Sequence, residues 1–437
     1  MDQGFIGRCV GTSTSIQNLT LANVNINATS GYVGAIIGEH YGTKLVVKNC
    51  KVSGNIGGDN SDNVGAIVGY IYNAEIEISN CINEATIKGR NYPGGLIGYL
   101  NNGTAKIQDC ANTANINGAY DVGGIVGFTS NPTLEITNCY NTGKINGSAY
   151  IAGIIGRAGG TITISGCYNS GDVSGDVNSG GNLIGGIMGT NAGSGQVKIQ
   201  NCYNTAVIKG KNCVGGISGN PRETNILKSY NIGNVMGTDN GIGGISGFDG
   251  NISFCYNKGN ITGTYYVGGI SGYGSNNIEN VYNLGDITSN YENPSKYSSV
   301  YVGGIAGSVT NIKNAYNLGT VTNESSSVGY IKAGGIVGEL SGTIDNTYNL
   351  KKVTYKNEEA TKCIGAITGY KSDTADLSTS YYLKGAYSTG TGTGTDTSQV
   401  KDTEADMKEV MNANLATLEG WKEDEQNINN GYPLLDF

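Results

Sequence analysis

Short runs of alternating apolar and polar residues recur along most of this 437-residue chain. Two examples are residues 134–137, which read Leu-Glu-Ile-Thr, and residues 161–164, which read Thr-Ile-Thr-Ile. A period of two places successive side chains on opposite faces of a strand, so each run predicts a half-buried β-strand. The pattern therefore indicates a chain built mainly of short strands.

A glycine-rich block separates groups of these runs. Its commonest form is Val-Gly-Gly-Ile-x-Gly, and its last glycine returns at steps of 25 to 35 residues. The twelve copies end at Gly38, Gly69, Gly98, Gly127, Gly156, Gly189, Gly219, Gly247, Gly272, Gly307, Gly338 and Gly369, and a degenerate copy ends at Gly11. A repeat of this length is typical of a solenoid, whose turns stack on one another, so we expect about 12–13 turns.

Each repeat carries a second block. Its fullest form, at residues 138–143, reads Asn-Cys-Tyr-Asn-Thr-Gly, and related versions recur in later repeats. Glycine adopts positive φ without a steric penalty, and asparagine tolerates it better than most residues. We therefore interpret both blocks as corners, with the strands lying between them.

Helical repeats are the alternative to strands, and the glycine content argues against them. Glycine accounts for 72 of 437 residues, and each glycine inside a helix costs about 1 kcal/mol relative to alanine. Strands that recur at a fixed period stack in parallel about 4.8 Å apart, and parallel crossovers are almost always right-handed. The sequence thus predicts an all-β chain folded as a right-handed parallel β-solenoid, or β-helix.

The pattern changes near the C-terminus. We expect a β-solenoid over residues 1–385, a Gly/Thr-rich connector over residues 386–398 and a capping segment over residues 399–437. One helix is predicted in the cap, with Thr403 as its N-cap and with an apolar face formed by Met407, Val410, Met411 and Leu415. Because an uncovered end would expose strand edges and core, we expect the cap to close the solenoid.

The two blocks together resemble the GLUG motif, which occurs in large bacterial surface proteins and in non-catalytic regions of some IgA-peptidase-like proteins. The resemblance is carried by residues 122–127, Val-Gly-Gly-Ile-Val-Gly, with residues 138–143, and it covers about residues 1–370. Trp421 and residues 429–435 are also similar to the segment that closes such arrays in Gram-positive surface proteins. The resemblance implies a cell-surface β-solenoid and names no ligand.

Seven of the ten cysteines occupy one equivalent site in successive repeats. They are Cys50, Cys81, Cys110, Cys139, Cys167, Cys202 and Cys255. Elsewhere this site holds Ser229, Val281, Ala315 and Thr347, a small and mostly apolar set. We expect an inward-facing row of free thiols, because cysteine packs as a small hydrophobe and in-register side chains fit disulfide geometry poorly.

The residue after this site is a tyrosine in eight repeats. These candidate ligand-binding residues are Tyr140, Tyr168, Tyr203, Tyr230, Tyr256, Tyr282, Tyr316 and Tyr348. Facing outward, they form an aromatic strip suited to stacking on sugar rings or gripping a protein loop; facing inward or packed at a corner, they are part of the core. The second is the simpler interpretation. The asparagines one place later predict a structural row of hydrogen-bonded amides.

The sequence contains few residues that could form a catalytic site. His40 is the only histidine, which excludes an H-E-x-x-H zinc site, and no glycine block ends as a nucleotide-binding loop does. We expect no catalytic residue, no cofactor and no metal site. Two alternatives remain: a polysaccharide-processing β-helix enzyme, although the acidic residues form no evident pair of catalytic carboxylates, or a non-catalytic region of a large surface peptidase, which the GLUG resemblance implies.

Charge and hydropathy limit the classes of partner that this chain can have. The net charge is −8, no basic stripe suggests nucleic acid, and no apolar run is long enough for membrane insertion. We expect an extracellular or cell-surface monomer excised from a larger chain, acting as an adhesive surface or as a stalk. A glycan or a host extracellular protein is the expected partner. Long repeats at residues 175–182 and 289–299 mark loops where binding is also conceivable.

Overall fold

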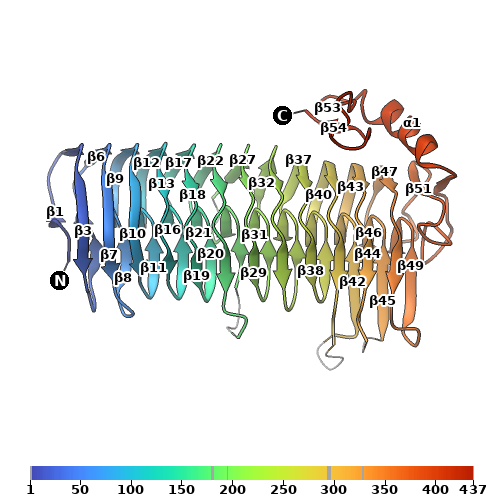
Figure 1. Ribbon diagram of the computed structural model, residues 1–437, viewed down its shortest axis with the longest axis horizontal. Helices are drawn as coiled ribbons and strands as arrows, with labels where there is room; N and C mark the ends of the chain where they lie inside the picture. The colour runs from blue at the N-terminus through green and yellow to red at the C-terminus, as the bar shows by residue number, and fades with distance from the viewer. Residues whose placement is uncertain (1, 179–181, 194, 293–296, 327–328, 437) are drawn as a thin grey trace. The chain divides into compact units, whose positions relative to one another are not determined.

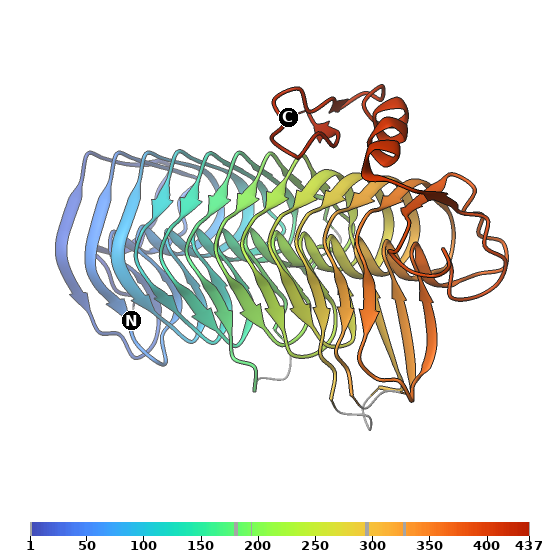
Figure 2. The same cartoon turned by 45° about the vertical axis from the view of Figure 1, so that its right-hand side comes forward.

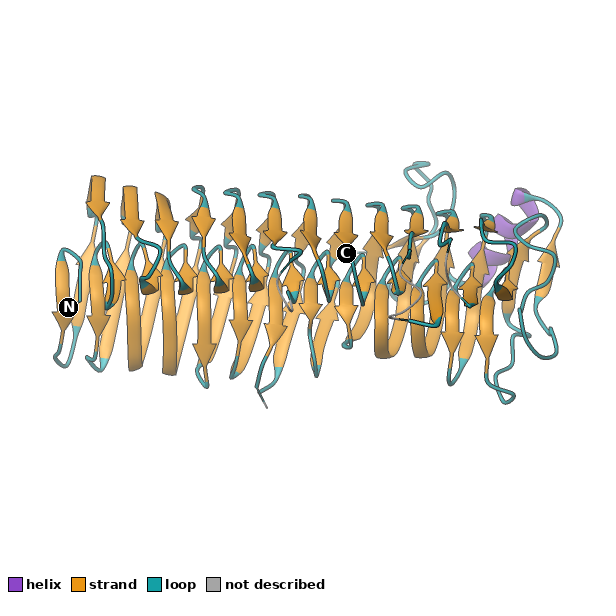
Figure 3. Ribbon diagram, turned by 90° about the horizontal axis from the view of Figure 1, so that it is seen from below, coloured by secondary structure: helices purple, strands orange, loops and turns teal. Residues whose placement is uncertain are grey.

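The computed structural model describes residues 2–178, 182–193, 195–292, 297–326 and 329–436. The described chain is almost entirely parallel β-structure with one short helix near the C-terminus (Figure 3). It divides into two compact units, Met1–Thr224 and Asn225–Phe437. Each unit is a β-solenoid, with about twelve turns in the two together. The predicted fold class is confirmed.

In the first unit, each turn contributes one strand to a short sheet and several to a larger one (Figure 1). The short sheet contains β4 (Tyr32–Gly34), β8 (Asp62–Gly65), β11 (Asn91–Gly94), β15 (Tyr120–Gly123), β20 (Ala149–Ala152), β25 (Ile184–Gly185) and β30 (Val214–Gly215). The larger sheet contains β1 (Ile6–Cys9), β2 (Thr14–Gln17), β3 (Thr20–Ile26), β5 (Ile37–His40), β6 (Lys44–Lys48), β7 (Lys51–Gly57), β9 (Val68–Ser79), β10 (Ile82–Lys88), β12 (Ile97–Gln108), β13 (Ala111–Asn112), β14 (Ile116–Asn117), β16 (Val126–Ser130), β17 (Thr133–Thr137), β18 (Tyr140–Asn141), β19 (Ile145–Gly147), β21 (Ile155–Ala158), β22 (Thr161–Ser165), β23 (Tyr168–Asn169), β24 (Val173–Gly175), β26 (Met188–Asn191), β27 (Val197–Gln200), β28 (Tyr203–Asn204), β29 (Ile208–Gly210) and β31 (Ser218–Asn220).

The second unit repeats this arrangement and adds the helix. Its short sheet contains β35 (Ile242–Gly243), β39 (Tyr266–Gly268), β42 (Ser299–Gly303), β45 (Tyr330–Gly334) and β49 (Thr361–Gly365). Its other strands are β33 (Tyr230–Asn231), β34 (Val235–Gly237), β36 (Ser246–Phe248), β37 (Asn251–Asn257), β38 (Ile261–Gly263), β40 (Ser271–Asn283), β41 (Ile287–Ser289), β43 (Ala306–Asn317), β44 (Val321–Asn323), β46 (Val337–Leu340), β47 (Ile344–Asn349), β48 (Val353–Tyr355), β50 (Thr368–Lys371), β51 (Ser380–Leu383), β52 (Gln399–Lys401), β53 (Trp421–Lys422) and β54 (Leu434–Leu435). β32 (Thr224–Leu227) begins at the last residue of the first unit.

The glycine block is required for close backbone approach rather than for positive φ. A Cβ added to Gly124 would lie 1.9 Å from the carbonyl oxygen of Gly153 and 2.9 Å from Cβ of Asn141. The left-handed corners instead fall on the first residue of the second block, such as Asn138 (φ 53°) and Gly166 (φ 63°). The prediction of corners holds, but the two blocks make them by different means: the second block uses positive φ, whereas the glycine block brings neighbouring backbones close together, with alanine at the equivalent of Gly124 in three copies (Ala35, Ala66 and Ala366).

The cysteine and asparagine rows both face the interior. The seven row cysteines form no disulfide and are at most 1% exposed, and burial raises the pKa of the Cys255 thiol to about 12. Asn141 Nδ2 donates to Asn169 Oδ1 at 2.8 Å and to the Gly143 carbonyl at 2.8 Å. The predicted rows of buried thiols and of hydrogen-bonded amides are confirmed for these residues.

Part of the Gly/Thr-rich segment continues the second unit instead of forming a free loop. The backbone N–H of Ile367 donates to the Gly390 carbonyl at 2.9 Å, and that of Gly392 donates to the Thr368 carbonyl at 3.0 Å. Thr391 also forms an isolated parallel bridge with Thr368. These bonds satisfy strand groups that would otherwise be unpaired. The long loops at residues 175–182 and 289–299 lie partly outside the described residues, which leave out residues 179–181 and 293–296.

The predicted helix is α1 (Glu404–Asn414). Thr403 caps it, and the side chain of Asp406 reaches back to the Thr403 backbone, which completes a capping box. Three residues of the predicted apolar face, Met407, Met411 and Leu415, are 0% exposed. Because the helix is short, this buried face is its main source of stability.

Candidate functional site

The eight tyrosines point outward from the turns. Tyr140 lies between Cys139 and Asn141, both 0% exposed, and is itself half-buried. Alternate residues of a strand face opposite sides, so the tyrosine must face away from the core. Of the alternatives left open, an inward position is therefore excluded for Tyr140, because the cysteine and the asparagine take the two inward positions.

In the first unit, Tyr140, Tyr168 and Tyr203 form a regular stack. Neighbouring ring centroids are 5.0 Å apart and the ring planes differ by 4°. The register pairs each tyrosine with the next along the axis of the unit. Parallel rings at this spacing cover one another's faces, which leaves mainly ring edges and hydroxyl groups toward solvent. This geometry favours contact through edges and hydroxyls over stacking of sugar rings on the tyrosine faces.

The surroundings of this stack are polar. Two residues after each tyrosine stand Thr142, Ser170 and Thr205, and all three are exposed. On the other side, Asn138 and Asn201 are exposed as well. The first-unit part of the row is thus an uncharged surface of phenol, hydroxyl and amide groups.

In the second unit, the same row becomes progressively buried. Tyr256 and Tyr282 stack at 4.9 Å, as do Tyr282 and Tyr316, with planes 1° and 2° apart. Tyr230 and Tyr256 are half-buried, whereas Tyr282, Tyr316 and Tyr348 are 3%, 0% and 0% exposed. Burial raises the pKa of Tyr316 well above its usual value.

The C-terminal tail, defined here as residues 402–436, covers this part of the row (Figure 2). The buried cluster between them contains Tyr282, Tyr316, Tyr348, Leu350, Met407, Met411, Leu415, Trp421, Tyr432 and Leu435. Leu284 and Leu318, partly buried, pack against it. These leucines and Leu350 stand two residues after a row tyrosine, where the first unit has threonine or serine.

Hydrogen bonds fix the tail on the row. The Tyr316 hydroxyl donates to the Pro433 carbonyl at 2.7 Å and accepts from Asn429 Nδ2 at 2.6 Å. Trp421 Nε1 donates to Asn280 Oδ1 at 2.9 Å, and Asn414 Nδ2 donates to the Tyr348 hydroxyl at 2.9 Å. The tail was expected to cover the open end of the solenoid; its buried contacts are instead with the side of the turns, where the tyrosines and leucines offer apolar surface.

A second aromatic surface in the first unit was not among the predicted site residues. We call it the corner patch, and it consists of Tyr32, Tyr41, Tyr70, Tyr72, Tyr92, Tyr99, Phe128 and Tyr150 with Arg8, Glu39, Asp121 and Arg157. Most of these residues directly precede a glycine block or directly follow its last glycine. This regular position was the sequence signal that could have identified the corner patch. It is a weaker signal than that of the tyrosine row, because the residue types vary from turn to turn.

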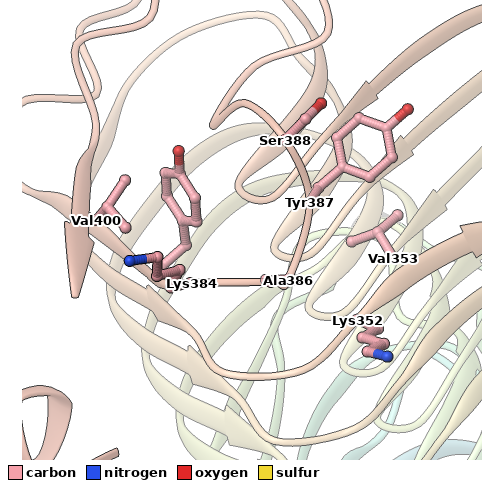
Figure 4. A pocket seen from close by; sticks show the side chains of 9 residues that line it. Lys352, Val353, Lys384, Ala386, Tyr387, Ser388 and Val400 are labelled. Atoms are coloured by element: carbon pink, nitrogen blue, oxygen red, sulfur yellow. The ribbon is translucent and has the colours of Figure 1, made fainter. Parts of the chain in front are cut away.

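Hollows on the second unit do not suggest hydrolytic chemistry. One, of about 600 Å³, is lined by Lys352, Tyr382, Lys384 and Tyr387 among others and has no carboxylate in its lining (Figure 4). Another, of about 490 Å³, includes Glu279, which is exposed, and Asp345, which is half-buried, so neither lies in an enclosed apolar site. A general acid of a glycosidase normally needs the desolvation that such a site provides. Within the described residues, no group of three or more His, Cys, Asp or Glu side chains is arranged to hold a metal ion.

Comparisons with known proteins add no identification. No protein-family model, no curated protein and no solved structure matches this chain significantly. The resemblance to GLUG repeats therefore stays an expectation from the sequence.

Proposed function

We propose that this chain is a non-enzymatic repeat module of a bacterial surface or secreted protein, and that its tyrosine row binds a protein partner. The β-solenoid arrangement is compatible with such a module. The extracellular setting is supported by the resemblance to GLUG repeats. Among the described residues, no helix combines the length and apolarity that a membrane crossing requires.

The observation that carries the proposal is the tail bound to Tyr282, Tyr316 and Tyr348. Here the row contacts a polypeptide through ring edges, and the tyrosine hydroxyls exchange hydrogen bonds with a backbone carbonyl and with asparagine amides. The chain therefore contains an example of how this surface takes up a protein segment. The first-unit tyrosines present the same rings at nearly the same spacing, with their edges accessible.

The composition of the first-unit row supports the same function. Tyrosine supplies a large amphipathic contact area at low cost in side-chain entropy, and serine, threonine and asparagine supply adaptable hydrogen bonds. Tyr140, Tyr168 and Tyr203 with Thr142, Ser170 and Thr205 combine these properties. Their mutual stacking holds the rings in place before binding, which lowers the ordering cost of association.

Two other functions are less well supported. A pure stalk does not require a regular row of half-exposed tyrosines, although it would tolerate one. A polysaccharide-processing enzyme needs two carboxyl groups at a defined separation with distinct protonation states, and the two hollows described above offer no such arrangement.

The test is binding of the whole chain to immobilised fibronectin, fibrinogen, collagen and immunoglobulin, followed by a triple variant, Tyr140→Ala, Tyr168→Ala and Tyr203→Ala. We expect saturable binding to at least one protein and a loss of tenfold or more in the variant. An unchanged melting temperature would show that the variant still folds. If the chain binds none of these proteins, or if the variant binds as tightly as the parent chain, the proposal is contradicted and the stalk is the better explanation.

A matched control distinguishes the contribution of the tyrosine rings to binding from that of their hydroxyl groups. Tyr140→Phe, Tyr168→Phe and Tyr203→Phe together keep the stacked rings and remove three hydroxyl groups. Because a hydrogen bond contributes about 0.5–1.5 kcal/mol, we expect the phenylalanine variant to bind more weakly than the parent chain and more tightly than the alanine variant.

A further inference from the structure

The corner patch lies where the glycine block of each turn in the first unit packs against the turn before it. The last glycine of each block lies against the backbone of the residue that precedes the block of the turn before it. A Cβ on Gly127 would lie 2.8 Å from the carbonyl carbon of Tyr92, and one on Gly156 would lie 2.7 Å from that of Asp121. This close approach brings two rows of side chains together from either side of the corner.

The corner patch mixes stacked and tilted rings, unlike the uniformly stacked tyrosine row: Tyr32 with Tyr70 and Tyr92 with Phe128 are stacked, at 15° and 24°, and the other pairs are tilted. Tyr70 and Tyr99 have centroids 5.2 Å apart with planes at 67°, and Tyr41 and Tyr70 lie 6.0 Å apart at 55°. Tyr41 and Tyr72 are 5.4 Å apart at 35°. Tilted rings do not fully cover one another's faces, and Tyr41 and Tyr72 are 39% and 42% exposed. This surface therefore has the open ring faces that the tyrosine row lacks.

Charged groups in the patch are paired and partly enclosed by the rings. Arg157 Nε lies 2.5 Å from Asp121 Oδ1, and its guanidinium stands 4.3 Å from the Phe128 centroid and 4.9 Å from the Tyr150 centroid. Asp121 is only 2% exposed, and burial raises its pKa to about 7 although Arg157 acts in the opposite direction. A second pair, Arg8 with Glu39 at 3.1 Å, lies beside Tyr41.

The backbone of the patch is also strained. Tyr92, Asp121 and Tyr150 have φ values of 60°, 57° and 59° in three consecutive turns. A left-handed conformation costs a non-glycine residue about 1–2 kcal/mol, and a buried ion pair is weak evidence for stability. Asn63, Leu183 and Cys213, which stand at the equivalent position outside the patch, have the same conformation, so this strain belongs to the repeat and is not specific to the corner patch.

We propose that the corner patch is a binding site for neutral polysaccharide, separate from the protein-binding tyrosine row. Open aromatic faces accept the C–H faces of sugar rings, and the accessible guanidinium groups of Arg8 and Arg157, held in place by the buried carboxylates, offer hydrogen-bond donors to hydroxyl groups. The two arginines balance the two acids, so the patch has no charge excess that would favour nucleic acid or an anionic membrane.

The experiment is affinity electrophoresis of the whole chain in gels that contain a soluble β-glucan, a galactomannan or glycogen, with polygalacturonate as an acidic comparison. We expect retardation by at least one neutral polysaccharide and a loss of tenfold or more in apparent affinity for Tyr41→Ala with Tyr72→Ala. Tyr72→Ala alone tests the site with less disturbance, because this ring is largely exposed. Tyr330→Ala, at 49% exposure in the second unit, is the matched control and should bind normally.

Several outcomes would overturn the inference. These are no retardation by any neutral polysaccharide, retardation by polygalacturonate alone, and equal retardation of the parent chain and the double variant. Loss of protein binding in the double variant, without any effect on polysaccharide, would make the patch a protein surface instead. The Tyr140, Tyr168 and Tyr203 alanine variant should keep polysaccharide binding, so failure of one proposal does not decide the other.

Discussion

The tyrosine row has two environments, and the contrast shows what decides its exposure. In the first unit, Tyr140, Tyr168 and Tyr203 are half-exposed beside threonine and serine; in the second, Tyr282, Tyr316 and Tyr348 are buried beside leucine. Ring spacing and ring orientation are nearly the same in both. The tyrosines alone therefore do not determine what covers them. In these six turns the residue two places later differs, threonine or serine against leucine, but Ile232, two places after the half-buried Tyr230, is 44% exposed, so contact with the tail and not this residue type alone decides what is covered.

The largest effect is expected from removing the tail. Deletion of residues 399–437 would expose the second-unit tyrosines and leucines and discard Met407, Met411 and Leu415, whose burial contributes about 1.5–3 kcal/mol each. We expect aggregation in size-exclusion chromatography and increased binding of an apolar dye. A monomer with an unchanged melting temperature would refute this. Ile428→Ser, at a residue 64% exposed, should have no such effect.

The next effect comes from exchanging the two environments. Leu284→Thr, Leu318→Ser and Leu350→Thr together give the second-unit row the neighbours of the first. We expect a loss of roughly 3 kcal/mol or more, because three apolar contacts with the tail disappear. Trp421, the only tryptophan, reports the change through its fluorescence, and hydrogen exchange in α1 should accelerate.

The reverse exchange is the control. Thr142→Leu, Ser170→Leu and Thr205→Leu alter exposed positions, so each should change stability by no more than about 0.5 kcal/mol. The new apolar patch should lower solubility instead. If both exchanges destabilise the chain equally, the two environments do not differ in the way described.

Substitutions in the asparagine row are expected to lower stability less than the tail deletion and the triple leucine exchange do, and by equal amounts in the two units. Asn141 and Asn283 each donate to the next asparagine, at 2.8 Å and 2.9 Å, and to a carbonyl two residues later, at 2.8 Å and 2.7 Å. Asn141→Ala and Asn283→Ala should each cost about 1–3 kcal/mol, because buried partners lose their hydrogen bonds. Denaturant unfolding measures both, and Thr142→Ala is the exposed control. A cost in only one unit would show that the interiors differ.

The smallest effect is a pH dependence confined to the first unit, which contains the only histidine. His40 is 0% exposed, and burial lowers its pKa. Its contribution to stability is therefore complete above the unfolded pKa of about 6.5 and is lost as the pH falls from there toward the folded pKa. Asp121, whose pKa is raised to about 7, acts in the opposite direction in both chains, so the test is the difference between them: when urea midpoints at pH 7.5 and 5.5 are compared, the parent chain should lose more stability, or gain less, than His40→Leu. Equal changes would exclude His40 as a cause.

Regular features were predictable because each repeats with the period of the solenoid. The strands, the buried thiols and the amide row all follow from position within the repeat, and Thr403 identified the start of α1. The direction of the tyrosines could not be decided from the sequence because one position considered alone did not reveal that Cys139 and Asn141 take both inward places. The corner patch was missed because its two rows lie on either side of a glycine block and vary in residue type.

The sequence by itself determined the repeat, the strand register and the composition of each row, because these depend on periodicity and on local backbone preference. The tertiary structure alone decided which part of the tyrosine row is covered. The bonds responsible join Trp421 to Asn280 and Asn429 to Tyr316, which are 141 and 113 residues apart. No local pattern encodes such a contact, since it forms only where two apolar surfaces meet after the turns have stacked.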